Sequence, residues 1–254
     1  MYAVILISQQ YTGDWNEALA QNAAGLGAKA AQVAIDLGVG IEIDYEENTT
    51  PNLVGLQAFI NAYRSIIPFD STGSNHSARL TIDVAAGCRY LIDINRKASA
   101  DWLGMNPSKP QVLDYANAMV TARPYGNAAD AIGWWQEHID GKPQYSPPVP
   151  PLAPAKFTGA LYLTSRSGLP SCNDYPNSLQ AELKSFVETV EPHPSIIDAG
   201  WTPGMLGFMF WAAGCPGTRS LCTIPSDGYT CEGGIGQASI EMGLPLNTTK
   251  LRQK

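Results

Sequence analysis

The chain has 254 residues, of which 44% are hydrophobic and 15% charged, and its formal net charge at pH 7 is −7. This length and apolar fraction predict a globular protein with one large core or two smaller ones. The negative charge argues against a nucleic-acid-binding surface, which would be basic, and no apolar run is long enough for a membrane span.

The first part of the chain predicts a strand, a helix and a second strand in succession. Residues 4–8 form a short apolar strand, and apolar side chains at helical spacing predict a helix over residues 15–37. Asp14 is a candidate N-cap for this helix, and Gly38 is a natural C-cap. Because residues 38–46 then predict a strand, the order forms a βαβ unit with a parallel strand pair.

Strands and helices continue to alternate further along the chain. The patterns predict helices over residues 53–66, 93–102 (in part), 128–139 and 178–190, and strands over residues 79–84, 112–120, 157–164 and 204–211. Six strands separated by helices indicate an α/β architecture. The proline-rich residues 142–154 suit either a linker between domains or a rigid polyproline loop, and the strand after them favours the loop. Residues 212–254 are predicted to be an irregular covering segment.

The second predicted strand carries three carboxylates at alternate positions. Side chains alternate between the faces of a strand, so Glu42, Asp44 and Glu46 point the same way, about 6.6 Å apart at a rise of roughly 3.3 Å per residue. Crowded carboxylates raise at least one pKa, which keeps a proton available for general-acid catalysis near neutral pH. An acidic edge strand facing solvent, or a cation site, would show the same spacing, so the pattern alone leaves these alternatives open.

The acidic strand resembles the fourth barrel strand of glycoside hydrolase family 18, the chitinases and endo-β-N-acetylglucosaminidases. That strand carries Asp-x-x-Asp-x-Asp-x-Glu, and the aligned positions in this chain are Val39, Glu42, Asp44 and Glu46. The last two match, Glu42 is a conservative change with a longer side chain, and Val39 departs from the pattern. The glycine, aliphatic and aromatic neighbours of the strand are also similar to those of the family.

Three later stretches are similar to further strands of the same family, in the family's order. They are residues 80–86 (fifth strand), residues 115–119 with Asn117 and Met119 (sixth strand), and residues 207–211 with a terminal Trp211 (eighth strand). The chain resembles the fungal endoglucosaminidase-like branch more closely than the bacterial chitinases. The resemblance implies a TIM-type (β/α) barrel formed by one catalytic domain over residues 1–254, incomplete at its N-terminus and with about six recognisable strands.

Two departures from the family concern the substrate site and the barrel. Thr121 stands where the sixth strand of the family has a tyrosine that bonds the acetamido group of the substrate, and Tyr125, Tyr162 and Tyr45 are candidates to replace it. The family has three strands before the acidic one, whereas this chain has one. The first and last strands of such a barrel would be open edges, so we expect the cysteine-rich tail, a homodimer or mutual pairing to cover them.

The resemblance implies retaining hydrolysis of β-1,4 linkages at N-acetylglucosamine, in a chitin-like polymer or an N-glycan core, with the acetamido group of the substrate as nucleophile. Glu46 would be the general acid, Asp44 would orient the acetamido group, and Glu42 would hold Asp44 and share a proton with it. The residues implied to contact substrate are Glu42, Tyr45, Asn117, Met119 and Trp211. No metal or cofactor is required, and neither nucleic acid nor membrane is expected as a partner.

A carbohydrate-binding protein with weak or no turnover is the alternative, because Val39, Glu42 and Thr121 depart from the family pattern. A storage or defence protein that uses only the scaffold is a third, weaker reading. Asp83 shares the face of the site only if the strand register holds, and Trp134 and Trp135 are expected to pack on the outside of the barrel. The three histidines receive no role.

The five cysteines match no zinc signature. Disulfides among Cys172, Cys215, Cys222 and Cys231 are predicted, with Cys88 as a buried thiol. The family resemblance and these disulfides favour secretion, whereas the apolar start of the chain lacks the charged residues and the cleavage site of a signal peptide.

Overall fold

The computed structural model describes residues 2–7, 12–119, 128–162, 177–197 and 199–211, and within them the side chains of residues 2–7, 12–14, 128–129, 161–162, 177–180 and 210–211 are not described. The described residues form strands and helices in alternation, which confirms the predicted α/β class. They divide into two compact units: the first comprises the residues up to Asn117 and residues 141–150, and the second comprises residues 118–140 and those after Pro150. A single catalytic domain stays a prediction.

The first unit is built on parallel strands that follow one another in chain order. The strands are β1 (Tyr2–Ile7), β2 (Gly40–Tyr45), β3 (Leu80–Val84) and β4 (Ala116–Ala118). β2 pairs in parallel with both β1 and β3. Backbone hydrogen bonds link β3 to the residues that lead into β4, with Asp114 N donating to Leu80 O at 2.9 Å and Ile82 N donating to Tyr115 O at 3.4 Å. The predicted βαβ unit is therefore confirmed.

The helices of the first unit follow the predicted boundaries closely. They are α1 (Thr12–Leu37), α2 (Leu53–Ile66), the 3-10 turn η2 (His76–Ala78), α3 (Ile92–Lys97) and the π-helical turn η3 (Ala98–Trp102). Helix α1 begins two residues before Asp14, so the predicted N-cap at Asp14 is wrong. Asn22 interrupts the helix with a non-helical backbone, and its side chain accepts a hydrogen bond from Gly25 N at 3.0 Å. Asn22 thus caps the second, longer segment of α1.

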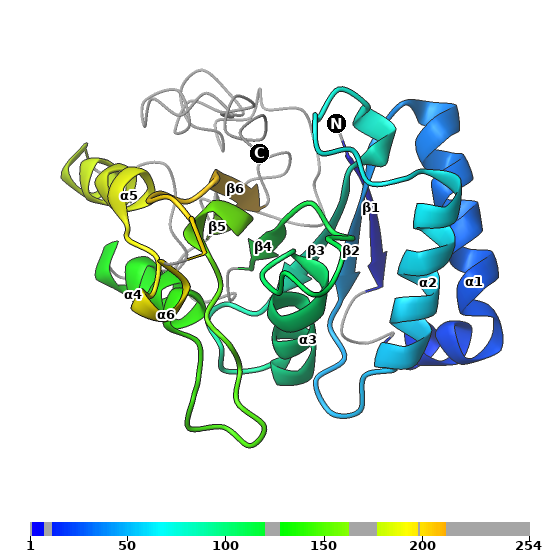
Figure 1. Cartoon of the computed structure of the whole chain (residues 1–254), viewed down its shortest axis with the longest axis horizontal. Helices are drawn as coiled ribbons and strands as arrows, with labels where there is room; N and C mark the ends of the chain where they lie inside the picture. Colours follow the sequence, from blue (N-terminus) through cyan, green and yellow to red (C-terminus); the bar gives the residue numbers. More distant parts are fainter. Residues whose placement is uncertain (1, 8–11, 120–127, 163–176, 198, 212–254) are drawn as a thin grey trace, which may run out of the picture. The chain divides into compact units, whose positions relative to one another are not determined.

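Helices α1 and α2 pack against each other beside β1–β3, as Figure 1 shows. Their contact depends on Gly27, because a Cβ atom there would lie 2.1 Å from the carbonyl oxygen of Phe59. Between the helices and the strands lies a fully buried apolar core, which includes Ile41, Ile43, Leu56, Phe59, Ile60, Leu80 and Ile82. Burial of these side chains supplies the main driving force for folding of this unit.

We expect Gly27→Ala to lower the free energy of unfolding by about 1–3 kcal/mol, because the new methyl group must push the backbone of Phe59 away. Gly133→Ala is the matched control: Gly133 lies inside a helix of the second unit with open space around its Cβ position. Since alanine is the better helix former, that variant should be neutral or gain up to about 1 kcal/mol. Urea denaturation of both variants checks the prediction, and equal effects would contradict it.

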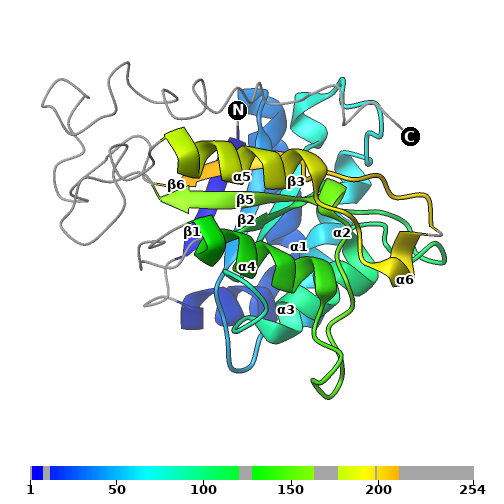
Figure 2. The same cartoon turned by 90° about the vertical axis from the view of Figure 1, so that its left-hand side faces the viewer.

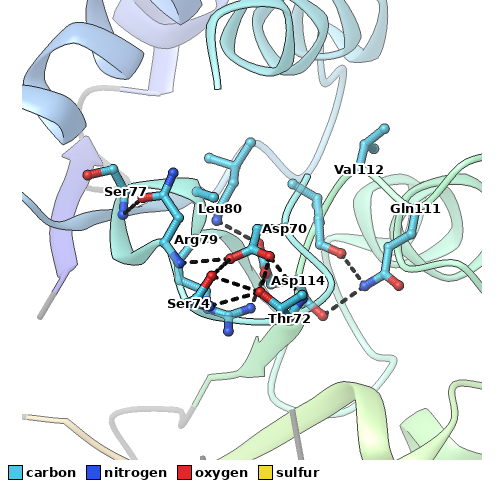
Figure 3. Close-up of polar contacts among 12 residues, drawn as sticks. Asp70, Thr72, Ser74, Ser77, Arg79, Leu80, Gln111, Val112 and Asp114 are labelled. Atoms are coloured by element: carbon cyan, nitrogen blue, oxygen red, sulfur yellow. Dashed lines mark hydrogen bonds and ion pairs between the residues drawn. The ribbon is translucent and has the colours of Figure 1, made fainter. Parts of the chain in front are cut away.

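The fourth strand is shorter than the predicted residues 112–120. The amides of Val112 and Leu113 both donate to the carbonyl oxygen of Trp102, at 2.9 and 3.0 Å, so these residues belong to a loop and not to the strand. Asp114 follows them and is almost completely buried. Its carboxylate accepts hydrogen bonds from Arg64, Arg79 and Leu80 N, and the last of these is 2.9 Å long. Figure 3 shows Asp114 with Arg79 and Leu80, beside the hydrogen-bonded turn of residues 70–74.

The second unit contains one parallel strand pair and the helices around it. Its elements are α4 (Ala128–Asp140), the 3-10 turn η4 (Pro154–Lys156), β5 (Phe157–Tyr162), α5 (Asn177–Thr189), α6 (Pro194–Ile197) and β6 (Gly207–Trp211). β5 and β6 pair in parallel, and Figure 2 shows α4 and α5 next to β5. Trp135 is buried at their centre, with its ring 6.2 Å from Phe186 and 5.8 Å from Phe208. It packs in the core of this unit.

The remaining predictions concern the proline-rich segment, the cysteines, the covering segment and membrane spans. Lys142 and Val149 exchange backbone hydrogen bonds of 2.8 and 3.1 Å, so the proline-rich segment folds back on itself as a loop. Cys88 is buried as predicted. The four cysteines predicted to form disulfides, and the covering segment after Trp211, lie outside the described residues. None of the helices described is both long and apolar enough to cross a membrane.

Candidate functional site

Strand β2 presents two chemically different faces. Ile41, Ile43 and Tyr45 are fully buried, and Tyr45 packs against Trp15 of α1 with ring centroids 5.7 Å apart. The Tyr45 hydroxyl accepts a hydrogen bond of 2.8 Å from Asn52 N and donates to the side chain of Asn16. This face is therefore bound to α1 and α2. The structure separates Tyr45 from the alternating carboxylates, which project on the other side of the strand.

The register of β2 and β3 adds a fourth acidic residue to the predicted three. Glu42 pairs with Thr81, and Ile43 pairs with Ile82, so the next residue of β3, Asp83, lies beside Asp44 on the same face. Asp83 is 4% exposed and Asp44 is 9% exposed, whereas Glu42 is half-buried. Glu46, one residue beyond the end of β2, is also half-buried. The carboxylates thus run from the buried strand pair to the carboxyl end of β2.

Asn117 of β4 completes the buried end of the cluster. Its side chain forms hydrogen bonds with the carboxyls of both Glu42 and Asp83, and these two carboxyls are hydrogen-bonded to each other. Asn117 is itself 3% exposed. Because a buried carboxylate is stable only with hydrogen-bond partners, the amide helps to hold both acids in place. The predicted site residue Asn117 thus lies beside Glu42 and Asp83.

Burial and mutual repulsion raise the pKa values of three of these acids. Burial and, to a smaller extent, the negative charges of Glu46 and Glu42 together raise the pKa of Asp44 to about 7. Burial also raises the pKa of Glu42, against hydrogen bonds that lower it. The pKa of Asp83 lies well above its ordinary value because of burial and then the charges of Glu42 and Asp44. At neutral pH the cluster therefore retains protons that isolated carboxylates would release.

A tyrosine from the loop after β3 approaches the same carboxylates. Burial raises the pKa of Tyr90, as do the charges of Glu46, Asp44 and Asp83. The loop is fixed by Asn95 of α3, which accepts a hydrogen bond from Ala85 N at 3.2 Å and donates one to Tyr90 O at 3.1 Å. The structure thus adds a phenol hydroxyl to the site. The sequence pattern of this loop carried no sign of it.

Two predicted site residues belong to the second unit and are described apart from the cluster. Met119 follows β4 and belongs to the second unit, as does Trp211, whose backbone ends β6 and whose side chain is outside the description. Thr121 and Tyr125 lie outside the described residues, and so does the side chain of Tyr162. The roles predicted for these residues stay predictions.

The arrangement of these carboxyls suits proton transfer. Within the described ranges, no group of three or more histidine, cysteine, aspartate or glutamate side chains is arranged to hold a metal ion. Oδ1 of Asp44 and Oδ1 of Asp83 are both buried, and neither has a hydrogen-bond partner among the described residues. A ladder of carboxyls that share protons, ending at the half-buried Glu46, can hold a proton and deliver it at one end.

We expect the raised pKa of Asp44 to make the protein less stable as pH rises. A carboxyl whose folded pKa of about 7 exceeds its ordinary value of 3.8 contributes stability that is complete below pH 3.8 and is lost as pH rises through 7. The resulting loss of unfolding free energy is on the order of 4 kcal/mol, because each unit by which the pKa of Asp44 is raised corresponds to about 1.4 kcal/mol. Asp44→Asn should therefore flatten the curve of unfolding free energy against pH.

Urea denaturation between about pH 4 and pH 8 measures this effect. Asp36→Asn, an exposed change on α1, is the control and should follow the wild-type curve. A wild-type curve that rises over this range, or an Asp44→Asn curve as steep as that of wild type, would contradict the prediction.

No protein-family model matches the chain, and no curated protein is significantly similar to it.

Proposed function

We propose that this protein hydrolyses β-1,4 linkages at N-acetylglucosamine by a substrate-assisted retaining mechanism of the kind found in glycoside hydrolase family 18. The observation that carries the proposal is the ladder of Glu42, Asp44 and Glu46 on one face of β2, which ends at the carboxyl end of a parallel strand. Functional groups of parallel α/β proteins gather at that end of the strands. The finer fold that we propose is a (β/α) barrel.

Glu46 is proposed as the general acid that protonates the glycosidic oxygen. It is half-buried just after β2, where a bound sugar could reach it. Its negative charge raises the pKa of Asp44, which shows that the two carboxyls are close enough to titrate together. As Glu46 donates its proton, the acetamido oxygen of the substrate attacks the anomeric carbon and the glycosidic C–O bond breaks. The leaving sugar departs with that proton as a hydroxyl group, and an oxazolinium ion remains. Glu46 then accepts a proton from the attacking water.

Asp44 is proposed to stabilise that ion. In the ionised state its carboxylate can accept the N–H of the acetamido group and balance the positive charge of the oxazolinium. The Oδ1 atom of Asp44 is buried and has no hydrogen-bond partner among the described residues, so the proposed bond would satisfy it once a sugar is bound. Tyr90 is the described tyrosine best placed to bond the acetamido oxygen, since burial and the nearby charges of Glu46 and Asp44 raise the pKa of its hydroxyl. Tyr45 is directed to the helices and is not available for that bond.

A carbohydrate-binding protein without turnover is the second candidate, and Val39 is the observation that favours it. The side chain is apolar and buried where the family pattern has an aspartate, so one carboxyl of the usual ladder is missing just before β2. Binding of an N-acetylglucosamine oligomer needs only shape and hydrogen bonds, whereas turnover needs the full set of proton-sharing groups.

Two assays distinguish the candidates. A fluorogenic chitobioside and a high-mannose glycopeptide test turnover, and calorimetry with chito-oligosaccharide tests binding. Release of sugar from either substrate supports the hydrolase, and the substrate that is cleaved identifies a chitin-like or an N-glycan preference. Binding without release supports the second candidate. Neither turnover nor binding would contradict both.

A further inference from the structure

The carboxyl of Asp83 has no role in the chemistry proposed above, although it is the most deeply buried acid of the site. The side chain is 4% exposed, and every residue of β3 is buried. Its Oδ1 atom has no hydrogen-bond partner among the described residues. Ionisation of a carboxyl in such a position would cost free energy, because burial removes water and no described group donates to that oxygen. We therefore expect the Asp83 carboxyl to stay protonated near neutral pH.

The neighbours of Asp83 show where that proton lies. Asp83 is hydrogen-bonded to the carboxyl of Glu42, and an ionised carboxylate can only accept, so one of the two acids must carry a proton. The charges that act on Asp83 are those of Glu42 and Asp44, and both are negative. Repulsion therefore favours one charge on the Glu42–Asp83 pair over two. The Asn117 side chain is hydrogen-bonded to both carboxyls and fixes the pair from β4.

We propose that Asp83 is a positioning residue that shares one proton with Glu42 and so keeps the Glu42 carboxyl aligned behind Asp44; its catalytic meaning rests on the proposed hydrolase function. Asp83 supplies from β3 the acidic partner that the buried Val39, just before β2, does not supply. Because the shared proton leaves the pair with a single negative charge, Asp44 meets less repulsion when it ionises beside the oxazolinium ion.

Infrared spectroscopy tests the shared proton without any substrate. At about pH 9 Asp44 is ionised, so the carbonyl band of a protonated carboxyl that remains in wild type would come from the Glu42–Asp83 pair. We expect Asp83→Asn to remove this band and Glu42→Gln to shift or remove it, whereas Ile82→Val, on the other face of β3, leaves it unchanged. Circular dichroism shows whether each variant is folded, and Asp83→Asn and Glu42→Gln each keep the shape of the side chain that they replace.

Three infrared results would overturn the proposal. They are a wild-type spectrum without the band, a band that persists in Asp83→Asn, and a band that Glu42→Gln leaves at its original frequency. In the chitobioside assay, Asp83→Asn should lower kcat by about 10-fold to 100-fold with KM changed by less than about twofold, since alignment and not binding is lost. An unchanged kcat would reject the positioning role. A wild type without turnover would contradict the proposed function, and the infrared result would still decide on the shared proton.

Discussion

Glu46→Gln is expected to lower kcat for chitobioside or glycopeptide hydrolysis by about 100-fold to 10,000-fold, with a small change in KM. The amide has the shape of the carboxylate and can still contact the sugar, but it cannot donate and recover a proton, and general-acid catalysis contributes a factor of this size. The change also removes the negative charge that raises the pKa of Asp44, so the pH dependence of any residual turnover should shift to lower pH.

Glu47→Gln is the matched control for Glu46→Gln. It is the same chemical change one residue further along the chain, and the Glu47 carboxylate accepts hydrogen bonds of 2.6 and 3.1 Å from the amides of Thr49 and Thr50. A glutamine oxygen can accept the same bonds, so this variant should keep wild-type kcat. If Glu46→Gln retains full turnover, or if both variants lose it equally, Glu46 is not the acid.

Asp114→Ala is expected to lower the free energy of unfolding by about 3–5 kcal/mol. The carboxylate is 1% exposed and forms ion pairs with Arg64 and Arg79, whose side chains are 9% and 12% exposed (Figure 3). Removal of the acid leaves two nearly buried guanidinium groups without their anion, and it also leaves Leu80 N without its acceptor. Because these bonds join α2, β3 and the loop before β4, the loss should weaken the whole first unit.

The exposed pair of Asp93 and Arg96 offers the control for Asp114→Ala. The Asp93 carboxylate is 50% exposed, and an ion pair in contact with solvent contributes at most about 1 kcal/mol. We expect Asp93→Ala to change the urea midpoint little and Asp114→Ala to lower it strongly. Comparable losses would show that burial does not set the strength of the Asp114 contacts. If Asp114→Ala is insoluble, Asp114→Asn gives a milder test, because the amide still accepts from Leu80 N.

The acidic face of β2 followed directly from the sequence. Alternation of Ile41, Glu42, Ile43 and Asp44 predicts one apolar and one acidic face, because the side chains of a strand alternate whatever surrounds it. The boundaries of α2 were predicted for a similar local reason, since its apolar residues recur at helical spacing and Asn52 caps its start. The predicted N-cap of α1 at Asp14 was wrong. A residue can cap a helix only where the helix begins, and α1 begins two residues earlier.

Only the tertiary structure decided which residues join the acidic face. Asp83 lies beside Asp44 because β2 and β3 pair in one register, and a shift by one residue would turn it to the opposite face. Tyr90 approaches the carboxylates because Asn95 fixes its loop. Tyr45, adjacent to Asp44 in sequence, lies against Trp15 on the far side of the strand. Local periodicity determines the direction of a side chain, whereas strand pairing and loop contacts determine what it meets.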